Sequence, residues 1–285
     1  MNMLKMLKTA AVFMALAVET VTFACPEYAS EETKRVIGKM VEAHGGLEHW
    51  RNAPSIRFDD LMHMETHDRQ QFGWWVAHEV IDQETRQVWQ DWPLNDARLG
   101  FDGDTVWSEN WRPGNNPPGF MVHFFYYFVN LPWLTQDDGV RLSAVSRFEW
   151  PGIDEPLYEV RMTFDGAPSV GKSNRDFFVL YIHPETWRLT GYQYGIGYAP
   201  LTAAMGMPDG SVFGPMWRLI THYEVVDGLV FPTAFHTMPE PGGRILGDHV
   251  ILNIDVATPF EKDKAAVPPG ADVYEGPLTT VLDEG

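Results

Sequence analysis

The alternation of apolar and polar residues predicts a protein built mainly of β-strands. From residue 56 onward, short alternating runs are separated by turn residues, which is typical of strands that place one face on a core. Turns such as residues 102–104 (DGD) and 227–228 (DG) join consecutive runs without an intervening helical pattern, so we expect antiparallel pairing. The predicted strands are Ile56–Thr66, Phe72–Ile81, Thr85–Trp92, Ala97–Phe101, Thr105–Ser108, Val140–Trp150, Leu157–Phe164, Phe177–His183, Leu189–Gly195, Trp217–Val226, Val230–Thr237 and Arg244–Val256.

One amphipathic helix precedes these strands. Ser30 is a favourable N-cap, and acidic residues follow it in the first turn. Apolar residues then recur at helical spacing, and two glycines, which accept the left-handed backbone of a helix end, close the pattern. The residues of this face and its end are Val36, Ile37, Met40, Val41, His44, Gly45 and Gly46.

Two segments interrupt the strand pattern. Pro117–Gly139 is densely aromatic and carries four aromatic residues at helical spacing, with Pro132 placed to end such a helix. Gly195–Pro215 is rich in glycine, proline and methionine and is predicted to be a long loop. We expect the aromatic segment to cover the sheet.

The first 24 residues match a secretory signal peptide. Lys5 and Lys8 precede the apolar run Thr9–Val18, and small and polar residues follow it. The run is too short to span a bilayer, which needs about 20 apolar residues. We therefore predict an exported protein of the periplasm or cell envelope, with residues 25–285 as a single domain.

The end of this segment allows two processing sites. An ordinary cut could follow Ala24, or Cys25 could be lipidated after cleavage and hold the protein on a membrane. Cys25 is the only cysteine in the chain, so no internal disulfide can form and the core alone must hold the fold.

The formal net charge of −18 limits the partners of the protein. Phosphate backbones require a basic surface, so nucleic acid is not an expected partner. The abundance of Trp, Tyr and Phe suits both a large sheet core and the wall of a pocket.

Several short motifs, taken in order, resemble the periplasmic lipoprotein-carrier superfamily (LolA/LolB-like proteins of lipoprotein sorting and their relatives of unknown function). Each is a turn or helix end, and together they extend over most of the mature chain. The motifs are residues 43–46 (AHGG) with Trp50, 101–107 (FDGDTVW), 130–132 (NLP), 180–186 (LYIHPET) with Leu189, and 223–232 (YEVVDGLVFP).

This resemblance implies a mainly β fold with few helices, in which a curved antiparallel sheet forms an incomplete barrel covered by helices. It also implies an apolar cavity between sheet and helices that takes a lipid or a lipoprotein acyl chain, without catalytic residues or a cofactor. The candidate ligand-binding residues are Phe72, Trp74, Val76, Trp89, Phe120, Phe124, Tyr127, Phe128 and Trp133. The first three alternate onto one face of a strand. The alternative for each is a dry, packed core, and with it a structural envelope protein.

A metal-dependent enzyme is the other alternative. His63, Glu65 and His67 would share one face of a strand and could bind zinc or iron, with His78 or His222 as a further ligand. The sequence contains no Gly-x-Ser-x-Gly elbow and no glycine-rich phosphate loop that opens a helix. Adjacent acidic pairs such as residues 59–60 are predicted to be solvated. We therefore expect no bound metal, no cofactor and no enzymatic activity.

Overall fold

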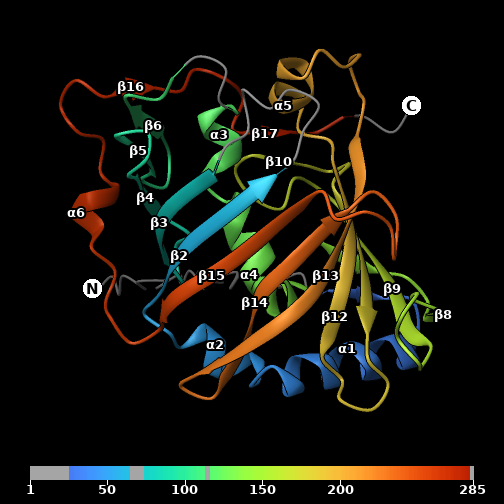
Figure 1. Ribbon diagram of the computed structural model, residues 1–285. Coiled ribbons are helices and arrows are strands. Elements are labelled where there is room, and N and C mark those ends of the chain that lie inside the picture. Colours follow the sequence, from blue (N-terminus) through green and yellow to red (C-terminus); the bar gives the residue numbers. More distant parts are fainter. Residues whose placement is uncertain (1–25, 65–73, 113–115, 283–285) are drawn as a thin grey trace, which may run out of the picture.

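The computed structural model describes residues 26–64, 74–112 and 116–282 (Figure 1). The helices are α1 (Glu31–Ala43), α2 (Leu47–Arg51), α3 (Pro118–Met121), α4 (Phe124–Leu134), α5 (Ala199–Ala204) and α6 (Lys262–Ala265). The strands are β1 (Glu27–Tyr28), β2 (Ser55–Met64), β3 (Trp74–Asp82), β4 (Val88–Trp92), β5 (Ala97–Phe101), β6 (Val106–Glu109), β7 (Val140–Leu142), β8 (Ser146–Phe148), β9 (Leu157–Phe164), β10 (Lys172–Ser173), β11 (Phe177–Ile182), β12 (Leu189–Ile196), β13 (Phe213–Val226), β14 (Leu229–Met238), β15 (Gly247–Asp255), β16 (Asp272–Val273) and β17 (Thr279–Thr280).

Nearly all strands belong to one large curved sheet. Its order is β1-β7-β9-β11-β12-β13-β14-β15-β2-β3-β4-β5-β6-β16, and β8 pairs with β9. The pairs are antiparallel except for β1 with β7, so the described strands form a mixed sheet that does not close into a barrel. The predicted mainly β fold, a curved sheet with few helices, is confirmed.

Helix α1 begins and ends where its sequence predicts. The Ser30 side chain accepts a hydrogen bond from the backbone N–H of Thr33 at 3.1 Å, as an N-cap does. Gly45 follows the last turn with a φ of 101°. A Cβ at this residue would lie 2.5 Å from the carbonyl oxygen of Gly228, so glycine allows α1 to pack closely against the β13–β14 hairpin.

The aromatic segment forms α3 and α4, and α4 lies inside the curve of the sheet (Figure 1). All eleven of its residues are buried. Its rings contact strands from both halves of the sheet: Phe125 lies beside Trp92 of β4, and Tyr127 stacks on Phe178 of β11. This helix therefore fills the concave side of the sheet.

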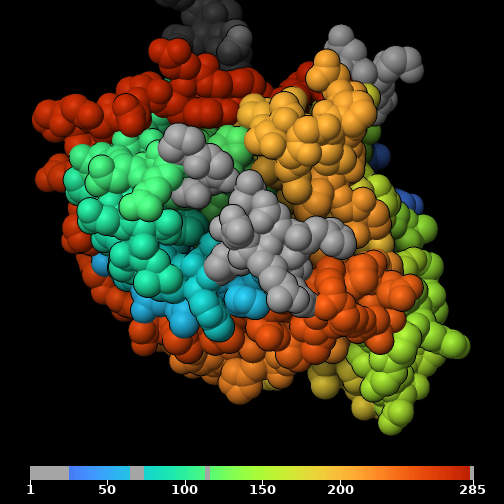
Figure 2. Space-filling model, turned by 45° about the horizontal axis from the view of Figure 1, so that its top comes forward, coloured from blue at the N-terminus to red at the C-terminus, as the bar shows by residue number. Residues whose placement is uncertain are grey.

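The convex side carries two smaller clusters. Trp150 and Tyr181 lie in one of them, and Trp89 and Val80 pack with Ala265 in the other. Figure 2 shows the C-terminal segment in red, running over the edge of the sheet that carries β5 and β6. The segment is tied there because β16 pairs with β6, and because the Trp107 indole donates a hydrogen bond to the carbonyl of Ala265 at 2.7 Å.

Three predicted features differ in the structure. Pro132 was expected to end the helix of the aromatic segment, but α4 continues through it to Leu134. The strand predicted at Val140–Trp150 is two short strands, β7 and β8. Ser143 separates them: its hydroxyl accepts the N–H of Arg161 at 2.9 Å, in place of a backbone carbonyl, and the chain leaves the ladder. The loop predicted at residues 195–215 contains helix α5, which starts with Pro200 in its first turn.

Candidate functional site

Charged side chains are buried on the concave face of the sheet, opposite α4. In β2, Asp60 lies between Phe58 and Met62 on the buried face, and its exposed fraction is 0%. In β3, Glu79 occupies the equivalent face and is also completely buried. Carboxyl groups are rarely buried without partners, so these positions require an explanation.

Asp60 is connected to a buried arginine through a histidine. His249 of β15 forms a hydrogen bond through Nε2 to Oδ2 of Asp60 and another through Nδ1 to Nη2 of Arg218 in β13. Arginine can only donate, so Nδ1 of His249 accepts and Nε2 carries the proton. The imidazole is therefore neutral, and it donates to Asp60.

The environment explains these protonation states. Burial lowers the pKa of His249 well below its usual value, and the charge of Arg218 lowers it further. Burial raises the pKa of Asp60, and Arg218 opposes this rise. The pKa of Glu79 is raised by burial and then by Asp60. One buried cation needs one anion, so Asp60 is the counter-ion of Arg218 and Glu79 is the neutral acid.

Glu79 is linked to the helical segment through Gln90 of β4. The Gln90 amide donates to Oε2 of Glu79 at 2.6 Å and to the carbonyl oxygen of Met121 at 3.0 Å. Its carbonyl oxygen accepts the indole N–H of Trp92 at 3.0 Å. The buried polar side chains on the concave face, Asp60, Glu79, Arg218 and His249, are called the polar floor. Gln90 thus joins the polar floor to the turn between α3 and α4.

Four buried polar atoms of this cluster have no hydrogen-bond partner within the described part of the chain. Each such atom costs about 1–3 kcal/mol of stability if it stays unpaired. They include a carboxylate oxygen of Asp60, which can only accept, and the Nε–H of Arg218, which can only donate. The atoms are Oδ1 of Asp60, Oε1 of Glu79, Nε of Arg218 and the hydroxyl of Tyr192.

Aromatic rings enclose the charged groups. The Arg218 guanidinium lies 4.2 Å from the ring centroid of Phe128 in α4 and 4.6 Å from that of Phe235 in β14. Phe235 stacks on His249, with centroids 5.0 Å apart. The polar cluster is thus sealed from water by α4.

The candidate wall residues that are described lie on the convex face instead. Trp74 is 58% exposed, and Trp89 packs against Ala265 under the C-terminal segment. Val76 shares its face of β3 with Trp74, whereas Trp75 points to α4 and contacts Phe124 with centroids 6.1 Å apart. Phe72, the other candidate of this strand, lies outside the described residues.

The five candidates from the aromatic segment are brought together. Each of them is at most 6% exposed, and they pack against one another and against the sheet. Phe124 contacts both Phe120 and Phe128. Trp133 lies further along, stacked on Trp50 with centroids 5.7 Å apart. In this closed arrangement these rings contact protein atoms, and an acyl chain would have to replace some of those contacts.

The alternative metal site is only partly described. His63 lies on the convex face of β2, with its ring 5.2 Å from that of Trp74, while Glu65 and His67 lie outside the described residues. His78 is bound to Asp59, Nδ1 to Oδ1, at 2.7 Å. No group of three potential metal ligands occurs in the described ranges. Cys25 also lies outside them.

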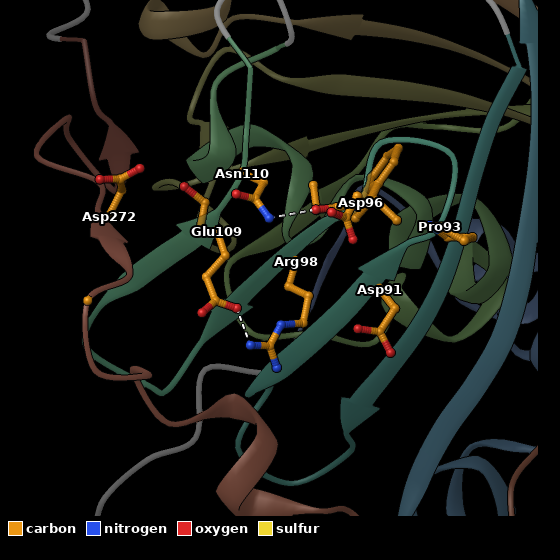
Figure 3. A pocket seen from close by; sticks show the side chains of 11 residues that line it. Asp91, Pro93, Asp96, Arg98, Glu109, Asn110 and Asp272 are labelled. Carbon is orange, nitrogen blue, oxygen red and sulfur yellow. Dashed lines mark hydrogen bonds and ion pairs between the residues drawn. The ribbon is translucent and has the colours of Figure 1, made fainter.

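An acidic pocket of about 550 Å³ lies on the surface beside β4, β5 and β6 (Figure 3). Arg98 forms an ion pair with Glu109 there, and the Asn110 amide donates to the carbonyl oxygen of Asp96 at 2.8 Å. Asp91 and Asp272 lie on opposite sides of the pocket. Asp96 and Asp272 are exposed to solvent, and the pocket is separate from the buried cluster.

Sequence reasoning missed the buried cluster. Asp60 was expected to be solvated beside Asp59, and the structure corrects this: Asp60 faces the core and Asp59 faces outward. One signal was present, because Asp60 alternates with Phe58 and Met62, and Glu79 with Ala77. A charged residue at a core position of a strand indicates a buried partner. The partner itself, His249, lies 189 residues away.

This chain is similar to known proteins in its fold. No protein-family model matches it, and no curated sequence matches it. A DUF1329 family protein from Desulfovibrio piger has a TM-score of 0.52 at 9% identity, covering 83% of this chain and 98% of its own. A LolA superfamily protein from Nitrosomonas europaea has a TM-score of 0.49 at 8% identity, covering 82% and 97%.

A putative outer membrane lipoprotein-sorting protein domain from Vibrio parahaemolyticus is a further similar structure. Its TM-score is 0.46 at 9% identity, covering 82% of this chain and 96% of its own. At these identities the likeness concerns the fold.

Proposed function

We propose that this protein binds a hydrophobic ligand, a lipid or an acyl chain, between its curved sheet and the helical segment 117–139, without making or breaking a bond. The observation that carries the proposal is α4. It is an apolar helix with all residues buried, laid along the concave face where a ligand would lie (Figure 1). In the closed protein this helix takes the place of a ligand.

An exchange of α4 side chains for an acyl chain is energetically feasible. Burying a methylene contributes roughly 0.8 kcal/mol, so a long chain that occupies the space of several rings replaces most of their contribution. The rings that an acyl chain would contact are already packed together between helix and sheet. Phe124 and Phe128 come from α4, and Tyr192 and Phe178 come from the sheet.

A few polar contacts hold the segment in place. Trp50 donates its indole N–H to Oδ1 of Asn130 at 2.8 Å. Gln90 holds the carbonyl oxygen of Met121, and Arg86 pairs with Asp137 at 3.2 Å. These contacts would have to break for a ligand to enter. The free energy needed to break them would keep the segment closed when no ligand is present.

The site of action in this proposal is the cell envelope. The predicted signal segment and the resemblance to periplasmic carriers support it, and lipidation of Cys25 would add an anchor. No helix among the described residues has the length and apolarity needed to cross a membrane.

The proposal is tested on the mature protein purified gently from cells. Native mass spectrometry followed by organic extraction should reveal a co-purifying lipid, and the delipidated protein should take up a fluorescent fatty acid ester. Phe128→Trp, which enlarges a side chain of α4 that packs on the concave face of the sheet, should reduce uptake. Trp74→Ser on the convex face is the matched control and should leave it unchanged.

The opposite result has a clear meaning. A folded protein that carries no lipid and takes up no probe would have a solid core and a structural role. Thermal unfolding of both variants controls for loss of folding, because a poorly folded Phe128→Trp would show a lowered Tm.

A further inference from the structure

We propose that Tyr192 and Arg218 together bind the carbonyl oxygen of an uncharged acyl group, so that the protein selects acyl esters or amides over free fatty acids. This inference rests on the proposed function and names the ligand class of the same site. It is carried by the unpartnered polar atoms of the buried cluster.

The two groups lie side by side. Tyr192 of β12 and Arg218 of β13 are directly paired residues in the antiparallel ladder, so their side chains share one face of the sheet. Both are essentially inaccessible to solvent. The Nε–H of Arg218 can only donate, and the Tyr192 hydroxyl can also donate. Neither finds an acceptor among the described residues. Two adjacent donors suit one acceptor oxygen.

The charge of the site argues for a neutral acceptor. Arg218 already has its counter-ion, Asp60, through the neutral ring of His249. A carboxylate brought into this sealed space would be a second anion with no second cation within the cluster, and burying an unpaired charge is strongly unfavourable. A carbonyl oxygen accepts the same hydrogen bonds without this penalty.

The remaining unpartnered atoms indicate what flanks that carbonyl. Oδ1 of Asp60 lacks a donor. Burial raises the pKa of the Tyr192 hydroxyl, and the charge of Asp60 adds a smaller rise. A ligand with a hydroxyl or an amide N–H next to its carbonyl would supply this donor. Monoacylglycerols and N-acyl amines have that arrangement.

The position of Phe128 defines where the acyl chain would run. Its ring covers one face of the Arg218 guanidinium in the closed state. Withdrawal of α4 would uncover the guanidinium, and the first methylenes after the carbonyl would take the place of the ring. The carbonyl would then lie at the polar floor and the chain along the sheet.

The experiment compares three probes of equal chain length: a monoacylglycerol, the free fatty acid and the hydrocarbon. Wild-type mature protein should bind the monoacylglycerol tightest, by about tenfold over the acid. Tyr192→Phe removes one oxygen and should weaken monoacylglycerol binding about five- to tenfold, the usual effect of one hydrogen bond. Binding of the hydrocarbon should not change.

Tyr192→Phe has a second readout that a structural role would not produce. Because its hydroxyl has no partner in the closed protein, its removal should raise the Tm of the unliganded protein while affinity falls. Tyr181→Phe, in the buried cluster on the convex face, is the matched control. It should leave the relative affinities of the three probes unchanged.

The outcomes separate the two proposals. Equal binding of monoacylglycerol to wild type and Tyr192→Phe would mean that the unpartnered atoms hold only buried water, and the inference would fall. A preference for the free acid would also overturn it, while the proposed function would stand. If no probe binds to the wild type, the proposed function and this inference fall together.

Discussion

Two buried histidines show how differently this fold uses the same side chain. His44, after the last turn of α1, holds the main chain of two strands: its Nδ1 donates to the carbonyl oxygen of Val230 at 2.6 Å, and its Nε2 accepts the N–H of Leu189 at 3.2 Å. His249 lies on the concave face and connects two charged side chains, Arg218 and Asp60. Both rings are completely buried.

The difference lies in what remains unsatisfied around each ring. The His44 junction uses both ring nitrogens and ties α1 to the sheet, so its role is fully explained by the fold. The His249 cluster satisfies its ring but leaves polar atoms of Asp60 and Arg218 without partners. A satisfied buried group needs no further explanation, whereas an unsatisfied one requires a cause beyond the fold. Here we infer that the cause is a ligand.

The strongest test of this contrast breaks the charged cluster. Arg218→Met should leave Asp60 as an uncompensated buried anion and lower the free energy of unfolding by about 3–5 kcal/mol. The double variant Arg218→Met/Asp60→Leu removes both charges and should recover most of that loss. Urea unfolding of both variants measures the difference. Equal losses in the single and double variants would show that the charges are not coupled.

The pH dependence of stability tests the His44 junction. Burial lowers the pKa of His44 to about 4, so the unfolded chain binds the proton first as pH falls. Stability should therefore be lost as pH falls from about 6.5 toward 4, by about 3 kcal/mol for this residue. His123, with its pKa lowered to about 4 by burial, adds a loss of the same sign.

The matched variant for this measurement is His44→Gln, which cannot be protonated. It should flatten the pH profile between pH 4 and 6.5 relative to wild type. Asp176, whose burial raises its pKa to about 6, works in the opposite direction in both proteins, so it cancels in the comparison. Profiles of equal slope would contradict the role given to His44.

A smaller effect is expected where α2 meets α4. Trp50→Phe removes the indole donor to Asn130 and leaves a buried amide oxygen without its partner, so the free energy of unfolding should fall by about 2 kcal/mol. The fluorescent ester should also enter faster, because one contact that holds the segment closed is gone. Unchanged uptake kinetics would separate this hydrogen bond from the opening step.

The smallest effect should come from a surface ion pair. His236 and Asp248 lie 2.8 Å apart, Nδ1 to Oδ1, near the polar cluster in sequence but on the exposed side of β14 and β15. His236→Ala should change the free energy of unfolding by less than about 0.5 kcal/mol. This variant shows what a histidine–carboxylate contact contributes when water surrounds it.

Much of the fold could be predicted because its signals are local. The cap at Ser30, the glycines after α1 and the hairpin turn at 227–228 each depend on neighbouring residues alone. The face of β3 was harder to predict, since Trp74 and Trp75 are adjacent and equally apolar. Only the packing of α4 against Trp75 decides which of the two is inside.

The site was less predictable because its partners are distant in sequence. Asp60, Arg218 and His249 meet only through the order of the strands, which places β15 beside β2. The aromatic segment could be recognised as a helix that covers the sheet, but its position inside the curve depends on how strongly the sheet bends. No local pattern in the sequence indicates how strongly the sheet bends.

The pairing of β2 with β15 also has a consequence for how the chain folds. The centre of the sheet joins an early strand to a late one, across a separation of 189 residues at Asp60 and His249. Contacts between such distant parts of the chain form slowly. The polar floor should thus be among the last parts to assemble, and amide hydrogens of β2 and β15 should acquire protection from exchange together, after those of the β13–β14 hairpin.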